Sequence, residues 1–217
     1  MRAPRLEPVP AEPADPELRQ ELLRWMPPGA GVAPLVLFRT LATHPALMQV
    51  MRPLGAHLLS RRCALALRTR ELLIDRVCAR CGCEYEWGVH VTAFGAAAGI
   101  DAATAEATLC AGADDPRWSP AESALLAAVD ELCAGPALRD ESWRRLAAHY
   151  DRAQCLEIVV AVGWYRLIST LCRGLALPLE PWAARFPRDA GEVAHSARSA
   201  AATPRMPASI SRSESDA

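Results

Sequence analysis

Apolar and polar positions follow the helical period along most of the chain. Between about residues 35 and 175 Ala and Leu dominate, β-branched residues are few, and no run alternates with the two-residue period of a strand. The first apolar stripe should end at His44, because the residue before Pro45 avoids the helical conformation. The pattern predicts an all-α fold. That first stripe comprises Leu35, Leu37, Phe38, Leu41 and Ala42.

Local signals divide the rest of the chain into further helices. Pro53 should kink or split the second segment, and Gly99 should end the fourth. Ser119-Pro-Ala-Glu122 has the form of a capping box with proline at the first helical position. We predict roughly eight helices, at about residues 35–44, 45–60, 67–82, 83–98, 102–110, 119–133, 140–150 and 151–174.

The two ends of the chain differ in composition from the middle. Residues 1–20 are rich in Pro, Glu and Arg, and residues 187–217 are rich in Ala, Ser, Pro and Arg without apolar periodicity. Such segments bury too little apolar surface to offset the entropy of ordering. We therefore predict disordered termini around one helical domain at 21–186.

Composition narrows the classes of partner and of chemistry. Of 217 residues 51% are hydrophobic, and the formal charge of −1 supplies no basic field for nucleic acid or an anionic membrane. The chain contains arginine but no lysine, and it contains no asparagine. These absences exclude Schiff-base lysines and Cys-His-Asn triads. Without an apolar leader or an obvious spanning segment, we expect a cytoplasmic protein with eight reduced cysteines.

Residues 70–90 contain the densest set of reactive side chains. Cys83, Glu86 and His90 are spaced to share one face of the helix that follows Gly82. Glu71, one helix earlier, can fold back against this face because the connection is short. His90 between two carboxylates would be a proton shuttle near neutral pH.

The run RELLIDRVCARCGCEYEWGVHVTAFGAAAGI resembles the core of the carboxymuconolactone decarboxylase and alkyl hydroperoxidase D (AhpD) superfamily. It is most similar to members with an Arg-Glu…Tyr-Glu-Trp-x-x-His signature, and the resemblance extends from about Phe38 to Pro181. It implies an AhpD-like helical bundle. It also implies a homo-oligomer, usually a trimer or hexamer.

The two branches of this superfamily imply different chemistry. In the hydroperoxidase branch Glu71, Cys83 and His90 match a proton relay and the first cysteine of a Cys-x-x-Cys pair, but Glu86 stands where the second cysteine belongs. A dithiol cycle in that register cannot run. In the decarboxylase branch the reaction is proton transfer with loss of CO2 from a small lactone acid, without cofactor.

We therefore expect a cofactor-independent enzyme, a carbon–carbon lyase or a related dehydratase or isomerase, acting on a small organic acid, lactone or biosynthetic intermediate. His90, Glu71, Glu86 and Cys83 are its candidate catalytic residues. The alternative is a thiol-dependent hydroperoxidase or disulfide reductase that uses Cys81 and Cys83. A non-catalytic relative with the same fold is a third possibility.

Several other residues have both a functional and a simpler structural interpretation. Cys78, Cys81, Cys83 and His90 offer four zinc ligands, but no second Cys-x-x-Cys accompanies them and we expect no metal. For substrate contact the candidates are Tyr85, Trp87 and Tyr165, with packing as the simpler role for the first two. The remaining cysteines are expected to be core residues. These are Cys63, Cys110, Cys133, Cys155 and Cys172.

Overall fold

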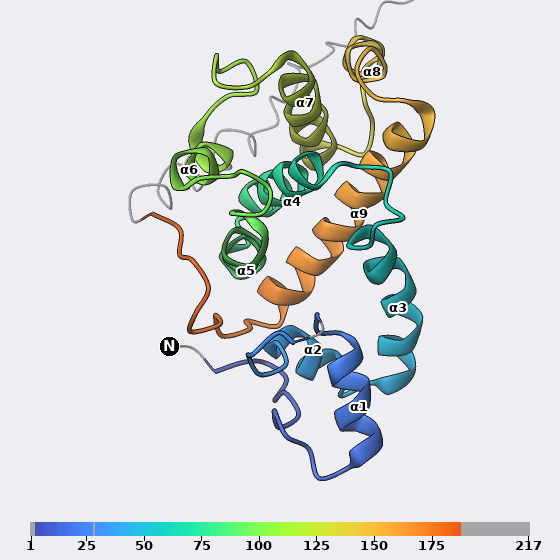
Figure 1. Cartoon of the computed structure of the whole chain (residues 1–217), viewed down its shortest axis with the longest axis vertical. Helices are drawn as coiled ribbons and strands as arrows, with labels where there is room; N and C mark the ends of the chain where they lie inside the picture. The colour runs from blue at the N-terminus through green and yellow to red at the C-terminus, as the bar shows by residue number, and fades with distance from the viewer. Residues whose placement is uncertain (1–2, 28, 188–217) are drawn as a thin grey trace, which may run out of the picture.

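The computed structural model describes residues 3–27 and 29–187, and all regular secondary structure in these ranges is α-helical. The predicted disordered tail therefore lies, from residue 188 on, outside the described residues. The described part contains nine helices, which are labelled in Figure 1. They are α1 (Pro16–Arg24), α2 (Val36–Leu41), α3 (Pro45–Leu58), α4 (Leu67–Cys81), α5 (Glu84–Phe94), α6 (Ala102–Cys110), α7 (Pro120–Ala134), α8 (Asp140–Ala147) and α9 (Arg152–Gly174).

Helices α4 and α9 form the centre of the fold. Helix α4 packs against α5, α6, α7 and α9, and α9 also contacts α3 and α8. Leu72, Leu73 and Ile74 of α4 are fully buried, so this helix has apolar contacts on more than one side. Helix α9 runs from the end of the molecule near α8 to the end where α1 and α2 lie (Figure 1). The core is thus built around two helices far apart in sequence.

The predicted helices are confirmed, with small changes at their ends. Ser119 and Glu122 form both hydrogen bonds of the capping box that begins α7. Helix α3 continues through Pro53 without splitting. Gly82 takes the left-handed conformation, with φ of 60°, between α4 and α5. Because glycine has no Cβ, it allows this sharp reversal.

The prediction that residues 1–20 are disordered is wrong for α1. Asp15 caps this helix by accepting a hydrogen bond from the Glu17 N–H, and Pro16 occupies the first helical position. Leu22 is fully buried. The composition misled because a nine-residue helix needs few apolar residues when one of them reaches the core. Before the helix, Arg5 and Val9 donate backbone hydrogen bonds to Leu175 and Arg39.

Helix α9 is long and apolar enough to cross a membrane by length and composition, with a mean hydropathy of 1.5 over its most apolar window. Half of that window is buried inside the fold. A central helix of a soluble protein has these properties, and α9 occupies that place against α4.

Candidate active site

A cavity of about 740 Å³ lies between the N-terminal segment, α3, α5 and α9. Its wall is mainly apolar, and the polar side chains that reach it include Glu86 and His90 of α5. Such cavities bury most of the surface of an organic ligand and orient it through a few polar groups. The aromatic residues in the wall are Trp25, Phe38, Phe94, Trp164, Tyr165 and Trp182.

His90 lies between two acidic side chains, as predicted. Its Nδ1 is 2.7 Å from Oε2 of Glu71 on α4, and its Nε2 is 3.4 Å from Oε1 of Glu86. His90 is 4% exposed and Glu71 is 1% exposed, so this contact is shielded from water. Glu86 lines the cavity and Glu71 does not. The Nε2 side of the imidazole therefore faces the cavity.

The ion pair changes the protonation of both partners. Burial opposes a charge on His90, but the charge and hydrogen bond of Glu71, with help from Glu86, raise the pKa of His90 to about 10. Burial by itself would raise the pKa of Glu71, whereas the positive His90 and Arg70 outweigh it and lower that pKa. The resting pair is an imidazolium held by a carboxylate.

Arg70 completes the support behind this pair. Its Nε donates to Oε1 of Glu71 at 2.9 Å, and its Nη1 reaches the carbonyl of Leu58 at 3.4 Å. The guanidinium also lies 6.0 Å from the centre of the Phe94 ring. Both oxygens of Glu71 are thus bound, and its carboxylate has one orientation toward His90.

Asp75 is a buried acid that the sequence analysis did not single out. It lies one turn after Glu71 on α4, is 1% exposed, and neither carboxyl oxygen has a partner among the described residues. Burial raises the pKa of Asp75 well above its ordinary value, the nearby Glu71 adds to this, and His90 opposes it. We therefore treat Asp75 as a neutral acid behind the ion pair. The four-residue spacing from Glu71 was a usable signal.

The cysteines lie outside the cavity. Cys83 is buried at the start of α5, where its thiol contacts that of Cys172. The contact with Cys172 and the backbone of the first turn outweigh burial and lower the pKa of Cys83. Cys81 contacts Cys133 of α7 instead. None of the eight thiols lines the cavity.

The expectation that the other five cysteines are core residues holds fully for two of them and in part for Cys63 and Cys133, which pack against the core. Cys155 and Cys172 are buried, Cys63 and Cys133 are half-buried, and Cys110 is exposed at the end of α6, so that prediction is wrong for Cys110. Across residues 3–27 and 29–187, no three His, Cys, Asp or Glu side chains are placed to hold a metal ion.

The predicted substrate-contacting aromatics take different places. Tyr165 lines the cavity and meets the His90 ring edge-on, with 5.3 Å between ring centres. Tyr85 instead donates to Glu180 at 2.5 Å and accepts from the Leu37 N–H. Trp87 donates to Thr108. The latter two side chains lie outside the cavity and join α5 to other elements.

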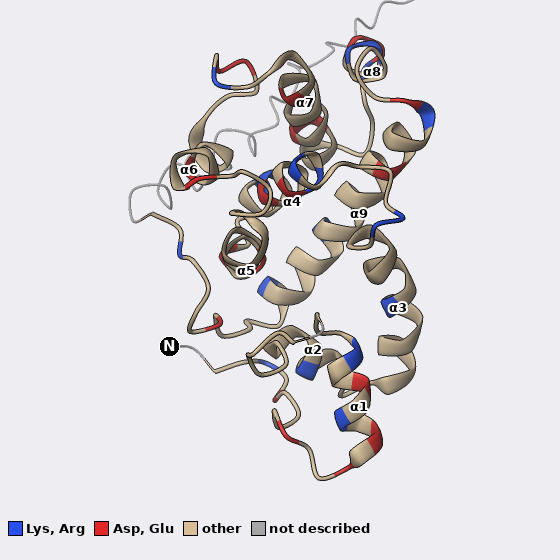
Figure 2. Ribbon diagram, viewed as in Figure 1, with Lys and Arg blue, Asp and Glu red and all other residues tan. Residues whose placement is uncertain are grey.

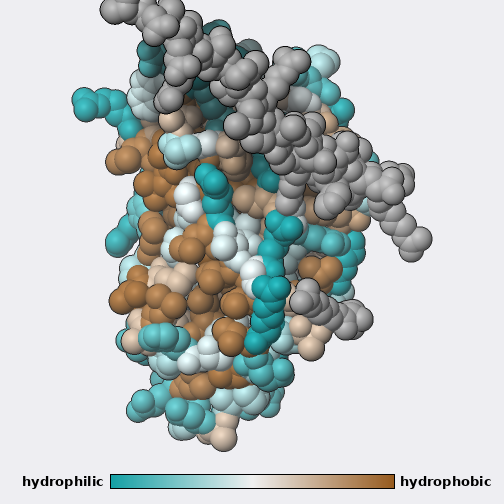
Figure 3. Space-filling view, turned by 180° about the vertical axis from the view of Figure 1, so that it is seen from behind, coloured by the Kyte–Doolittle hydropathy of each residue, from teal (hydrophilic) through white to brown (hydrophobic). Residues whose placement is uncertain are grey.

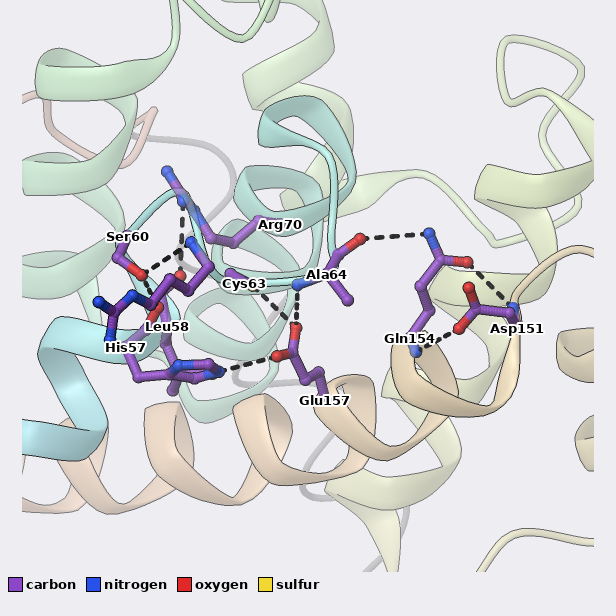
Figure 4. A network of polar contacts seen from close by, with 10 residues as sticks. His57, Leu58, Ser60, Cys63, Ala64, Arg70, Asp151, Gln154 and Glu157 are labelled. Atoms are coloured by element: carbon purple, nitrogen blue, oxygen red, sulfur yellow. Dashed lines mark hydrogen bonds and ion pairs between the residues drawn. The ribbon is translucent and has the colours of Figure 1, made fainter.

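A second polar network lies on the other side of α3, around Glu157 of α9 (Figure 4). Oε1 of Glu157 is 2.8 Å from Nε2 of His57, and Oε2 accepts from the Cys63 thiol and the Ala64 N–H. Gln154 also donates to the Ala64 carbonyl. These contacts attach the segment between α3 and α4 to α9. Arg70, which binds Glu71, follows this segment in the first turn of α4. His57 thus has a structural role.

Comparison with known proteins identifies one similar protein family and several similar folds. Residues 45–131 match the model of the carboxymuconolactone decarboxylase family. An uncharacterised peroxidase-related protein from Silicibacter sp. TM1040 has a TM-score of 0.72 at 15% identity, over 86% of this chain and 97% of that one. The curated proteins compared include no significant match. A central region of the chain therefore matches this family's model, and the fold is shared with solved AhpD-like proteins.

Two further solved structures share the fold. The AhpD-core peroxidase-related protein from Ralstonia eutropha JMP134 has a TM-score of 0.71 at 15% identity, over 83% of this chain and 94% of that one. The debrominase Bmp8, solved as a cysteine-to-alanine variant with 2,3,4-tribromopyrrole, has a TM-score of 0.63 at 16% identity, over 84% and 91%. The fold is thus shared with proteins described as peroxidase-related and with a debrominase.

Proposed function

We propose that this enzyme catalyses proton transfer to carbon in an organic acid or lactone bound in the cavity, with His90 as the proton donor. The observation that carries the proposal is the buried ion pair: Glu71 holds one ring nitrogen of His90, and the other ring nitrogen faces the cavity. A histidine held in this way has a fixed orientation and presents its second N–H, beside Glu86, to the cavity.

Decarboxylation is the reaction that uses these features most fully. When the substrate carboxylate leaves as CO2, the electron pair of the broken bond remains on carbon, and that carbon takes the proton from Nε2 of His90. The imidazole is then reprotonated from water. Charge spreads out as CO2 leaves, so an apolar cavity favours this step relative to water. Related dehydrations and isomerisations need the same proton donor.

Glu86 supplies the second polar group on the cavity wall. Its Oε1 lies near His90, whereas its Oε2 is buried and has no partner among the described residues. Buried oxygens of this kind usually have a hydrogen-bond donor. We assign to Oε2 the binding of a substrate hydroxyl or of the water that reprotonates the imidazole.

The thiol-dependent alternative has less support. Cys81 and Cys83 are each in contact with a different thiol, Cys133 and Cys172, and none of these four side chains lines the cavity. A hydroperoxide bound in the cavity would not meet a nucleophilic sulfur there. Oxidation of these cysteines would have to proceed from another surface.

The test uses a panel of organic acids and lactones in D2O, with CO2 release and deuterium incorporation at carbon as the readouts. We expect His90→Gln to lose about 100-fold or more in rate, the usual contribution of a positioned acid. A Cys81→Ser/Cys83→Ser variant should keep the activity. Turnover that survives in His90→Gln, or that needs both a hydroperoxide and these two thiols, would contradict the proposal.

A further inference from the structure

The cavity is unusually large and apolar for a site that takes a small polar acid. At about 740 Å³ it falls in the range of roughly 300–1,000 Å³ that holds drug-sized ligands. Six aromatic side chains contribute to its wall, from α2, α5, α9 and the segments that follow α1 and α9. Aromatic rings recognise other flat ring systems through stacked and edge-on contacts. Such a wall fits a ligand with one or more rings.

Part of the cavity wall comes from residues that precede the matched family region. Residues 24–38, which precede the family match at 45–131, contribute Trp25, Leu37 and Phe38 to the cavity. The Trp25 and Phe38 rings lie 4.9 Å apart and pack together. His90 and Glu86 lie within the matched region. Five of the six wall aromatics therefore lie outside the region that carries the reacting groups, and only Phe94 lies within it.

Arg52 of α3 brings a positive charge to this apolar wall. It is half-buried, it lines the cavity, and its Nε donates a long hydrogen bond of 3.4 Å to the Arg24 carbonyl. Within residues 3–27 and 29–187 it forms no ion pair with an acidic side chain. Its neighbour Arg24, by contrast, pairs with Glu21. An arginine in this position is available to an anionic ligand, for which its planar group is well suited.

We propose that the cavity binds a hydrophobic, ring-containing organic anion, with the ring system against the aromatic wall and the anionic group paired with Arg52. This inference deepens the proposed function and rests on it only for the statement that the ligand's reacting carbon faces His90. The binding statement stands on the cavity, the aromatic wall and Arg52.

The test measures binding of two probes that do not react. Anilinonaphthalene sulfonate has aromatic rings and an anionic group, and N-phenylnaphthylamine has the same rings without the charge. We expect the full chain to bind one molecule of the sulfonate. Naphthoate should displace it and acetate should not, because acetate offers no ring to the wall. Equal displacement by the two carboxylates would overturn the proposal.

Three variants locate the bound probe. Arg52→Gln should weaken the sulfonate about tenfold, the effect of losing one charge-assisted contact, and leave the neutral probe within about twofold. Ala56→Trp fills the cavity from an exposed wall position and should weaken both probes at least as much. Arg61→Gln removes an exposed arginine outside the cavity and should change neither.

Two results with these variants would also overturn the proposal. If Ala56→Trp leaves both probes bound, they occupy another surface; if Arg52→Gln affects the two probes alike, no anion is recognised. His90→Gln serves to separate this inference from the proposed function, because it should retain the sulfonate within about twofold while losing turnover. Intact probe binding together with turnover independent of His90 would contradict the acid/base proposal alone.

Discussion

At the scale of single residues, the chemistry depends on Glu71 and His90 holding opposite charges in a buried place. Two isolated charges there would be costly, but each provides the other with a partner at 2.7 Å. Arg70 binds the second oxygen of Glu71. The same contacts that orient His90 therefore also keep it protonated.

Replacing Glu71 by Gln should destabilise the fold by about 3–5 kcal/mol, because it leaves the buried His90 and Arg70 without their carboxylate. The wild-type pair contributes fully between about pH 4.5 and 6.5, the ordinary values of its partners. Its contribution falls as the pH drops through the lowered pKa of Glu71 or rises through the raised pKa of His90. Urea unfolding across pH measures this.

The matched control is Glu141→Gln, an exposed acid in the first turn of α8. It should change the free energy of unfolding by less than about 0.5 kcal/mol. A Glu71→Gln protein with the pH profile of the wild type would mean that the ion pair does not form.

For Asp75 we predict that stability changes with pH in the direction opposite to that for Glu71. A carboxyl whose pKa is raised in the fold costs stability as the pH rises above its ordinary value of 3.8, because the unfolded chain can ionise it freely. Asp75→Asn has nearly the same shape and cannot ionise. We expect its stability relative to the wild type to increase from pH 4 to pH 8, as measured by thermal unfolding. A difference that decreases over this range would show that Asp75 is ionised in the fold.

At the scale of helices, close packing rather than charge fixes α5. A Cβ on Gly88 would lie 2.1 Å from the carbonyl oxygen of Ala184 and 3.4 Å from the Ala183 side chain. The Ala184 N–H in turn donates to the Gly88 carbonyl at 3.3 Å. The segment after α9 can therefore approach α5 only where a glycine stands. That segment includes Trp182 of the cavity wall.

Gly88→Ala should accordingly destabilise the protein by about 1–3 kcal/mol, the usual cost of overpacking. Gly135→Ala is the matched control, since nothing lies within 4 Å of a Cβ at this residue after α7 and its backbone is extended. It should be neutral or stabilise by up to about 1 kcal/mol, because alanine restricts the unfolded chain more than glycine does. Chemical denaturation compares the two. Equal stability of both variants would contradict this packing.

The helices themselves follow from local patterns, and this explains what could be predicted from the sequence. The capping box at Ser119 and the break at Gly82 depend on neighbouring residues alone, and both are present. The placing of Glu71 beside His90 followed from the short connection between their helices. In contrast, the contacts of Tyr85 with Glu180 and of Cys83 with Cys172 join segments about ninety residues apart, which no local pattern reveals.

The cavity could not be predicted for the same reason. Its wall combines residues from the first forty positions with residues from α9 and beyond. The residues before position 20 were expected to be disordered, so the arginine-rich start of the chain gave no sign that it would lead into a binding wall. Arg52 likewise could not be distinguished from the other arginines in the sequence, and only the fold shows that it lines the cavity.

At the scale of the whole molecule, apolar side chains remain on the surface. Leu156, Val160 and Leu167 of α9 are 66%, 37% and 44% exposed, and Val50 of α3 is 73% exposed. Charged residues are sparse on α3 and along the middle of α9 (Figure 2). Apolar residues also gather on the face seen from behind (Figure 3). Exposed apolar areas of this kind mark interaction surfaces.

We propose that the exposed apolar face of α9, formed by Leu156, Val160 and Leu167, is covered by another copy of the chain. This agrees with the homo-oligomer that the family resemblance implies. Leu156→Glu/Leu167→Glu should reduce the mass measured by light scattering, because each carboxylate would be buried in the interface. Trp143→Glu, an exposed apolar position on α8, is the control and should leave the mass unchanged. A wild-type chain that is monomeric would contradict the proposal.

The central claim is that His90 is an imidazolium held by Glu71, with its second nitrogen on the cavity. The most direct test is a ¹⁵N NMR titration of the imidazole nitrogens of the full-length protein. We predict that His90 keeps both protons through neutral pH and titrates near pH 10. In Glu71→Gln it should titrate at a much lower pH. A wild-type His90 that loses its proton near its ordinary pKa of 6.5 would contradict the account.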